Sequence, residues 1–239
     1  MEVKNYLLGY KNLYIMQNTE MFNFSIDSVL LPNFATITKK TKKILDIGTG
    51  NAPIPIILST KTKAKITAIE IQRDVYKLAK KSLELNKLEE KIELLNEDII
   101  DYAKECPTDT FDLITCNPPF FKLNSASKLN DNDYKTIARH EIKLNIFQVC
   151  EIAKKLLKNN GYLAIVHRSD RMMDIVTAMR SNNIEPKTIQ FVYPKNTENS
   201  NAILIEGIKN AKPGLKIKPP LVVHNDNGKY TKEIESYFK

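Results

Sequence analysis

The chain has 239 residues, enough for one large α/β domain with a small appendage. It has no run of about 18 apolar residues, and its first residues lack the apolar block of a signal peptide, so we expect a cytoplasmic protein with no membrane span. The three cysteines are widely spaced, form no CxxC pair and cannot all pair with one another, which favours free thiols in a reducing compartment and argues against a zinc site, so no metal is expected.

The formal net charge of +8 favours a polyanionic partner such as a nucleic acid. Lysine outnumbers arginine 31 to 5, however, and the excess is spread along the chain, which a general compositional bias would also produce. A basic run such as 39–43 is compatible with a simple solvated face. The charge is therefore supporting information only. The sequence does not define an oligomeric state, and a monomer is the preferred interpretation.

The first 42 residues precede the regular pattern of the chain, and we expect them to pack over the functional site as an N-terminal segment. They contain Phe22 and Phe24, and then an apolar run beginning near Ser25 that looks helical. Ser25 or Asp27 has a suitable side chain to cap that helix.

From residue 43, short apolar runs alternate with longer amphipathic stretches, which is typical of a parallel sheet covered by helices. Strands are predicted at 43–47, 64–70, 91–95, 111–115, 161–167, 188–193 and 202–208. Helices are predicted at about 53–60, 72–86, 139–159 and 169–182, with Gly161 just beyond the end of the third. We therefore expect an α/β fold of the Rossmann-like type over residues 43–208, with a seven-stranded, mostly parallel, doubly wound sheet.

Two segments fall outside this alternation. Residues 122–136 are polar and lack apolar periodicity, so we expect a mobile lid over the site. Residues 209–239 are rich in Lys and Pro and are expected to pack on the domain as a basic C-terminal tail.

The first strand of the alternation ends in a glycine turn that opens onto a helix. Gly48 and Gly50 allow a tight turn and a close approach to a ligand. Dinucleotide enzymes use a similar turn to hold a pyrophosphate. Here the third glycine is missing, Pro53 begins the helix, and Asp46 precedes the turn, where its charge would repel a pyrophosphate but attract a sulfonium or an amino group. This pattern favours S-adenosylmethionine over NAD.

Acidic side chains follow the next two strands. Glu70 stands where a carboxylate accepts hydrogen bonds from both ribose hydroxyls of a nucleotide cofactor. Asp98 can accept from an adenine amine while Ile99 covers the ring. Taken singly, Glu70 and Asp98 are equally well explained as helix caps or exposed loop acids. Their place at successive strand ends makes a shared crevice the better explanation.

The fourth strand stops at Asn117-Pro118-Pro119-Phe120. The two prolines remove two backbone donors and force the chain out of the sheet as a stiff, extended turn. The Asn117 side-chain oxygen and the Pro118 carbonyl then become fixed acceptors, and Phe120 can stack on an unstacked base. These groups suit methyl transfer to an exocyclic amine of a planar base, which needs its hydrogens held and no strong general base. The alternative is an ordinary strand-ending turn.

With both motifs, the chain resembles the class I S-adenosylmethionine-dependent methyltransferases. More narrowly, it is similar to the bacterial enzymes that methylate N6 of the adenosine 3′ of the anticodon, position 37, in valine tRNA. The resemblance covers nearly the whole chain through Gln17 and the segments 22–31, 138–141, 166–168 and 192–195. It implies a flipped adenosine as the target and tRNA as the partner.

The resemblance also implies residue roles. The residues that would hold the cofactor are Asp46, Gly48, Gly50, Glu70, Asp98 and Ile99, with Phe24 and Asp27 at its border. The target base would be held by Asn117, Pro118, Pro119 and Phe120. Ala52 stands at a position that is often glycine in this family, a departure that should not prevent binding.

Other substrates remain open: guanine N2 in ribosomal RNA, adenine in DNA, a protein glutamine, or none, if the chain is a non-catalytic RNA-binding relic of the fold. The glutamine class usually carries Tyr where this chain has Phe120, and the intact Asp46 and Asn117 speak against a relic. We expect His140 and His167 to be structural. The candidates for contact with RNA phosphate are Arg139, Arg168 and Arg171.

Overall fold

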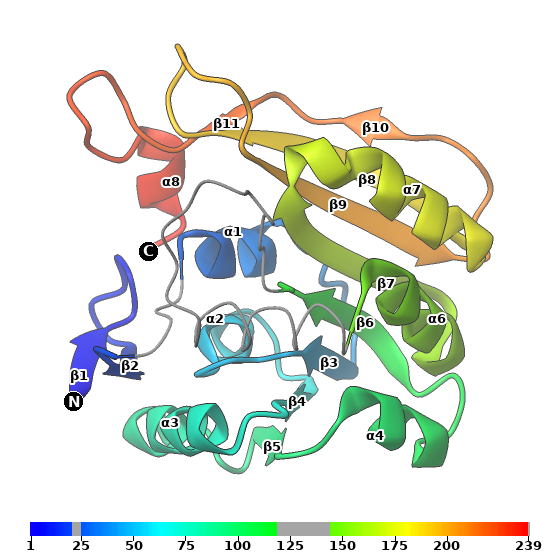
Figure 1. The fold of residues 1–239 in the computed structure, drawn as a ribbon, viewed down its shortest axis with the longest axis horizontal. Helices are drawn as coiled ribbons and strands as arrows, with labels where there is room; N and C mark the ends of the chain where they lie inside the picture. The colour runs from blue at the N-terminus through cyan, green and yellow to red at the C-terminus, as the bar shows by residue number, and fades with distance from the viewer. Residues whose placement is uncertain (21–24, 119–143, 239) are drawn as a thin grey trace, which may run out of the picture.

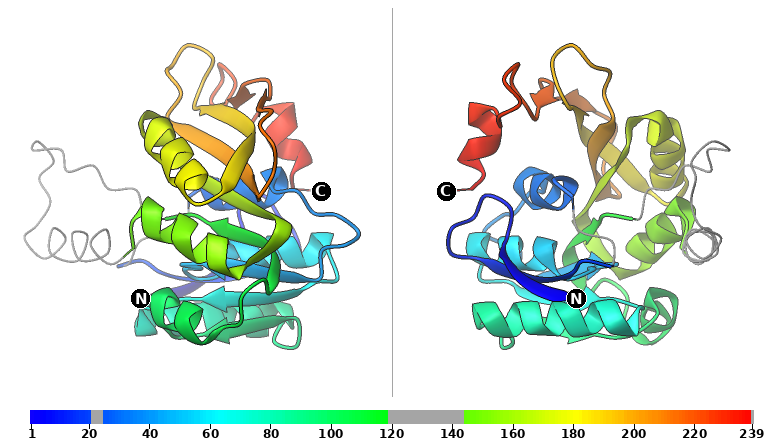
Figure 2. Two further views of the ribbon diagram at one scale, coloured as in Figure 1. Left: turned by 90° about the vertical axis from the view of Figure 1, so that its right-hand side faces the viewer. Right: turned by 60° about the vertical axis from the view of Figure 1, so that its left-hand side comes forward.

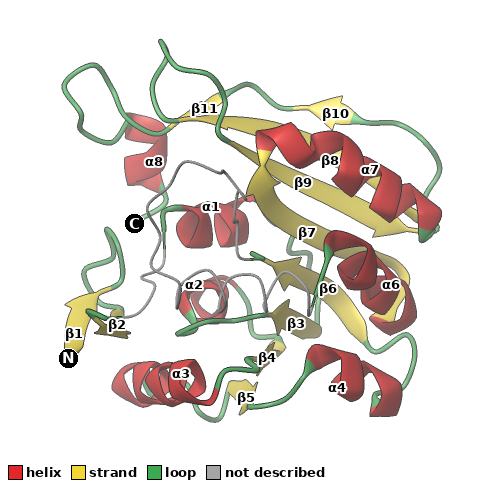
Figure 3. Ribbon diagram, viewed as in Figure 1, coloured by secondary structure: helices red, strands yellow, loops and turns green. Residues whose placement is uncertain are grey.

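The structure is a computed structural model that describes residues 1–20, 25–118 and 144–238. A central sheet has helices on both faces (Figures 1 and 3). Its strands are β3 (Lys43–Ile47), β4 (Lys65–Ile69), β5 (Ile92–Leu95), β6 (Phe111–Cys116), β7 (Leu157–Arg168), β8 (Ile184–Tyr193), β9 (Ala202–Lys209), β10 (Lys216–Ile217) and β11 (Leu221–Val222). Within the described residues the strand order is β10-β8-β9-β7-β6-β3-β4-β5, with β11 also paired to β8.

All pairings in this sheet are parallel except those of β9, which runs antiparallel to both β7 and β8. The seven strands expected from the sequence are all present. The sheet is larger than expected, because the short strands β10 and β11 of the C-terminal segment extend it beyond β8. Their two residues each are too few to give an alternating apolar pattern.

Two hydrophobic clusters cover the two faces of the sheet. Alternate residues of each strand point to opposite faces, so Ile44 packs in one cluster and Leu45 in the other. The first cluster includes residues of α1 (Asp27–Phe34), α2 (Pro53–Lys61) and α3 (Arg73–Asn86). The second includes residues of α4 (Ile99–Glu105), α6 (Ile146–Leu156) and α7 (Met172–Ser181). Figure 2 shows these two groups of helices on either side of the sheet.

The helix expected over 139–159 ends earlier than predicted, and residues 139–143 lie outside the described part. Asn145 and Gln148 form a capping box at the start of α6. The helix ends at Leu156, and Leu157 already pairs with Phe111 as the first residue of β7. Gly161 therefore lies inside a strand and does not end a helix. A Cβ there would lie 2.9 Å from the Lys158 carbonyl oxygen, so a close backbone approach explains this glycine.

The helix expected over 169–182 is a short 3-10 turn, η1 (Ser169–Arg171), followed by α7. At the start of α1, neither Ser25 nor Asp27 acts as the side-chain cap. The N-cap residue is Ile26, which makes no capping bond. The Ser25 hydroxyl instead donates to Asp27 Oδ2 at 2.7 Å, which ties these two side chains together.

Several elements are absent from the sequence prediction. A hairpin of β1 (Glu2–Tyr6) and β2 (Tyr14–Asn18) rests on α3, where Met16 N–H donates to the Ser82 hydroxyl and the Asn86 amide bonds Tyr14 in both directions. The other additions are α4 and α8 (Lys232–Ser236). Among residues 1–20, 25–118 and 144–238, no helix is long and apolar enough to cross a bilayer.

Candidate active site

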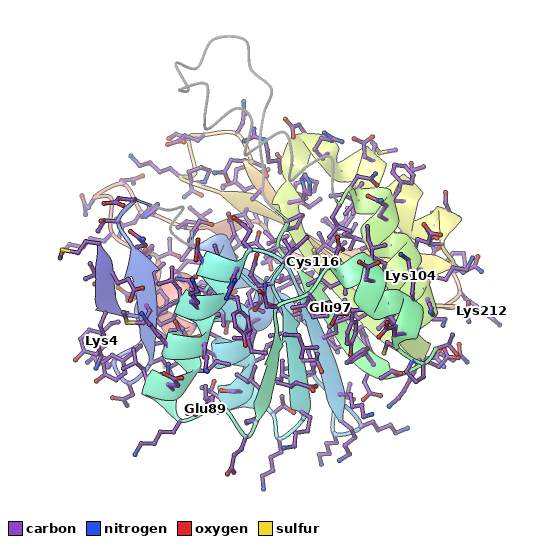
Figure 4. The ribbon with its side chains drawn as sticks, turned by 60° about the horizontal axis from the view of Figure 1, so that its bottom comes forward. Lys4, Glu89, Glu97, Lys104, Cys116 and Lys212 are labelled. Atoms are coloured by element: carbon purple, nitrogen blue, oxygen red, sulfur yellow. The ribbon has the colours of Figure 1, made fainter. Side chains whose placement is uncertain are left out.

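The sequence motifs meet at one edge of the sheet. The strands β6, β3, β4 and β5 are neighbours and run parallel, so their C-terminal ends lie together. Figure 4 shows this arrangement: Cys116, at the end of β6, and Glu97, just beyond β5, lie toward one edge, and Glu89 lies toward the other. The edge that carries Cys116 is the candidate site.

Asp46 is completely buried at this edge. Its Oδ1 accepts a hydrogen bond of 2.6 Å from the hydroxyl of Thr115, its direct register partner on β6. Its Oδ2 has no hydrogen bond from any described residue. Burial raises the pKa of Asp46 to about 7, an effect that the Thr115 and Thr49 hydroxyls partly offset and that nearby Glu70 reinforces. The Thr49 hydroxyl lowers the pKa of Asp46 only by lying near the carboxylate, because its buried Oγ1 makes no hydrogen bond within the described residues. A buried carboxylate oxygen without a donor fits a ligand that brings an N–H group.

The glycine turn beside Asp46 is open. Gly48 and Gly50 have φ angles of 66° and 60°, in the left-handed region that other residues rarely adopt. A Cβ added to either glycine would meet no atom within 4 Å. The conformation requires glycine, and the space over the turn is free for a ligand to approach the backbone.

Glu70 ties the glycine turn to the next strand end. This side chain is only 4% exposed. Its Oε2 accepts from Gly50 N–H and its Oε1 from Gln72 N–H, each at 2.9 Å. Burial raises the pKa of Glu70, and these backbone donors partly offset that rise. Each carboxylate oxygen keeps a second lone pair, which suits hydroxyl groups of a ligand.

Asp98 is the N-cap of α4, and its Oδ1 accepts from Ile100 N–H at 2.9 Å. The cap is one of the two readings that the sequence allowed, and it leaves Oδ2 for other donors. Ile99 is 6% exposed and packs within the second hydrophobic cluster, so only a small part of its side chain faces outward.

Asn117 follows β6 directly, and its side-chain Nδ2 donates to the Ser28 hydroxyl at 3.1 Å. No hydrogen bond from the described residues reaches Asn117 Oδ1. Ser28 belongs to the first turn of α1, next to Asp27, whose pKa is raised by burial. The expected site residues Phe24, Pro119 and Phe120, and the expected lid over 122–136, lie outside the described residues.

Comparison with known proteins identifies the fold and the family. The model of the methyltransferase small domain family matches residues 25–182. The chain belongs to this family. Among the related proteins, the tRNA1(Val) (adenine(37)-N6)-methyltransferase of Flavobacterium psychrophilum is 27% identical over 95% of both chains. That of Flavobacterium johnsoniae is 30% identical over 67% of both chains.

Solved structures support the same fold. A predicted O-methyltransferase from Agrobacterium tumefaciens has a TM-score of 0.71 at 20% identity, over 89% of this chain and 95% of that chain. The 16S rRNA N2 G1207 methyltransferase of Thermus thermophilus, in complex with AdoMet and guanosine, has a TM-score of 0.57 at 15% identity, over 87% of this chain and 50% of that chain. The predicted class I methyltransferase fold and the predicted methyltransferase activity are thus confirmed.

Ala52 stands where the family resemblance predicts glycine, and its backbone adopts a conformation that favours glycine. It is the N-cap of α2 with φ 72° and ψ 34°, a left-handed conformation that costs a non-glycine residue about 1–2 kcal/mol. Glycine loses about 0.5–1 kcal/mol through its greater freedom in the unfolded chain. The difference is between zero and about 1.5 kcal/mol, so we expect Ala52→Gly to leave the thermal midpoint unchanged or to raise it by up to about 6 °C, measured by calorimetry, because 1 kcal/mol corresponds to about 2–4 °C at this chain length. A lower midpoint would contradict strain at Ala52.

The remaining histidine and arginine candidates of the methyltransferase follow β6 in the sequence. His167, at the end of β7, is partly buried and its Nδ1 accepts from Arg168 N–H at 2.8 Å. Burial, then the nearby Arg171, lower the pKa of His167 to about 4, which keeps the ring neutral. Arg168 and Arg171 form ion pairs with the acidic side chains Asp170 and Asp174. Arg139 and His140 lie outside the described residues.

Two residues of the site escaped prediction from the sequence. Thr115 offered a signal, since it is a polar residue in the otherwise apolar end of a buried strand. Ser28 offered none that distinguishes it from an ordinary helix residue. Within the described residues, no group of three or more His, Cys, Asp or Glu side chains is placed to hold a metal ion.

Proposed function

We propose that the enzyme transfers a methyl group from S-adenosylmethionine to N6 of adenosine 37 in valine tRNA. The observation that carries the proposal is the orientation of the Asn117 side chain, whose Nδ2 is occupied by Ser28 while Oδ1 receives no donor from the described residues. Asn117 follows β6, the strand next to the one that ends at the buried Asp46. The names of the relatives supply the tRNA substrate.

The residues at the strand ends fit the proposed cofactor. Asp46 Oδ2 is a buried acceptor without a donor, which suits the cofactor's amino group. The free space over the glycine turn allows a close backbone approach, and Glu70 has lone pairs for ribose hydroxyls. Asp98 Oδ2 would accept from the adenine amine. When bound, S-adenosylmethionine supplies an activated methyl group on a sulfonium.

The protein's part in the reaction is to hold the amine. Asn117 Oδ1 and the Pro118 carbonyl would each accept one N–H of the target amine, which directs the nitrogen lone pair away from them. Phe120 would stack on the base, a contact worth about 1–3 kcal/mol. Fixed acceptors position the amine for attack and stabilise the positive charge that develops on its nitrogen. The neutral His167 is not required as a base.

An anticodon-loop adenosine suits this site because flipping an unpaired base costs less than opening a base pair. The net charge of +8 is consistent with a tRNA partner. We further propose that residues 1–42 pack over the cofactor site, that 43–208 form the methyltransferase domain, and that 209–239 pack on it. The enzyme would then act in the cytoplasm as a monomer.

The test is to incubate the enzyme with labelled S-adenosylmethionine and total tRNA from a strain lacking the gene, and then to digest the RNA and identify the labelled nucleoside. We expect N6-methyladenosine, located at position 37 of valine tRNA. Label in N2-methylguanosine, or only in protein, would contradict the proposed substrate.

A separate measurement tests the cofactor. Saturating S-adenosylmethionine should raise the thermal midpoint, since a ligand at 100 times its Kd stabilises the folded state by about 2.7 kcal/mol. The absence of any stabilisation would reject the cofactor assignment independently of the result with tRNA.

A further inference from the structure

Ser28 is the described partner of the Asn117 side chain. Its hydroxyl accepts from Asn117 Nδ2 at 3.1 Å, across 89 positions of the sequence. Ser28 is 4% exposed, and its backbone N–H donates to the Ser25 carbonyl at 3.1 Å. Figure 1 shows α1 beside the C-terminal end of β6, where this bond is made.

The hydroxyl is held on a fixed platform. The three residues that follow Ser28, Val29 to Leu31, are fully buried in the first hydrophobic cluster. Helix α1 packs on α2 and on β7, so its first turn cannot shift without disturbing that cluster. The position of Ser28 relative to the sheet is therefore set by the core.

Asn117 has one degree of freedom that its backbone does not fix. Pro118 restricts the Asn117 backbone to extended conformations. The terminal torsion of an asparagine is broad, however, and a half turn exchanges Oδ1 with Nδ2. In one orientation the amide presents an acceptor to a target amine. In the other it presents N–H groups to N–H groups, which cannot hold the amine.

We propose that Ser28 is a positioning residue that selects the productive orientation of the Asn117 amide. By accepting from Nδ2, it turns Oδ1 toward the target amine. The inference rests on the proposed function, because it needs Asn117 to hold an amine, but it applies to any planar amine. Ser28 itself does not touch the reacting atoms.

The first test compares Ser28→Ala with the wild-type enzyme in steady-state methylation of tRNA. Ser28→Ala leaves Asn117 Nδ2 without its described acceptor in the productive orientation and so disfavours that orientation. We therefore expect kcat to fall about tenfold, with KM for tRNA and the Kd for S-adenosylmethionine each within about twofold. Ser28→Thr, which keeps the hydroxyl, should restore most of the lost kcat. The matched control is Ser59→Ala, which removes another buried helical hydroxyl, one that bonds only the Ile56 carbonyl of its own helix α2. An unchanged kcat in Ser28→Ala would overturn the proposal.

The second test separates orientation from general disruption. A carboxylate has two equivalent acceptor oxygens and no N–H, so Asn117→Asp has no wrong orientation to exclude. In that background we expect Ser28→Ala to change the single-turnover rate less than about twofold. If Ser28→Ala lowered the single-turnover rate equally in the wild-type and the Asn117→Asp enzymes, the proposal would be overturned, since Ser28 would then not act through the orientation of the Asn117 amide.

The proposed function and the positioning role of Ser28 can be rejected independently of each other. A wild-type enzyme that forms no N6-methyladenosine rejects the proposed function, whatever the behaviour of Ser28. A Ser28→Ala enzyme as fast as wild type, on whichever amine is methylated, rejects the inference and leaves the proposed function intact.

Discussion

Asn117→Ala should lower kcat about 10²- to 10³-fold while leaving the affinity for S-adenosylmethionine nearly unchanged. Removing a preorganised hydrogen-bonding group from the reacting centre typically costs a factor of this size. The substitution removes one of the two acceptors proposed to hold the amine. It does not alter Asp46 or Glu70, whose hydrogen bonds come from Thr115 and from backbone N–H groups. Turnover with tRNA and the cofactor-induced thermal shift measure the two effects.

Asn159→Ala is the matched control for this substitution. Asn159 is exposed at the start of β7, and its Oδ1 accepts from Asn210, away from the strand ends that form the site. It should retain full activity. If Asn117→Ala kept more than a tenth of the wild-type kcat, the amine would have to be held by another group.

The sheet was predictable from the sequence because its strands are buried on both faces. Such strands appear as continuous apolar runs, and the runs at 43–47 and 111–115 agree with β3 and β6 to within one residue. The junction of α6 and β7 was not predictable. Apolar Leu156 ends the helix and apolar Leu157 begins the strand, so the composition does not change where the structure does.

The residues of the candidate site were predictable where they follow strands, since parallel strands bring their C-terminal ends to one edge. Their partners were not. Asp46 and Thr115 are 69 positions apart, and Asn117 and Ser28 are 89 apart. A single sequence gives neither the register that sets Thr115 opposite Asp46 nor the docking of α1 that brings Ser28 to Asn117.

Asp46→Asn should stabilise the cofactor-free enzyme at neutral and alkaline pH. Burial raises the pKa of Asp46 from 3.8 to about 7 in the folded protein. Between these values the folded state holds a proton that the unfolded state has lost, so stability falls as the pH rises from about 4 to about 7. The difference between the two pKa values corresponds to a loss of up to about 4 kcal/mol in the free energy of unfolding above pH 7. Asparagine does not ionise and keeps an acceptor for Thr115, so it avoids this loss.

The expected result is a higher midpoint of denaturant unfolding for Asp46→Asn at pH 8, with a difference that disappears near pH 4. Asp112→Asn is a control of opposite sign. Although burial raises the pKa of Asp112, hydrogen bonds from Lys158 Nζ and from the N–H groups of Lys42 and Lys43 outweigh it, and the pKa is lowered. Asp112→Asn should therefore destabilise the protein at pH 8. A midpoint for Asp46→Asn at or below that of wild type at pH 8 would contradict the prediction.

Asp46→Asn should also weaken the binding of S-adenosylmethionine about 10- to 100-fold, because a hydrogen bond to a charged group is worth about 1.5–3 kcal/mol. Asparagine would offer its amide N–H groups where Asp46 Oδ2 offers an acceptor, so the cofactor's amino group would lose its partner. Calorimetric titration at pH 8 measures the loss. Greater stability together with weaker binding would show that the buried carboxylate is kept for the ligand at a cost to the fold, and unchanged affinity would mean that the cofactor's amino group is bound elsewhere.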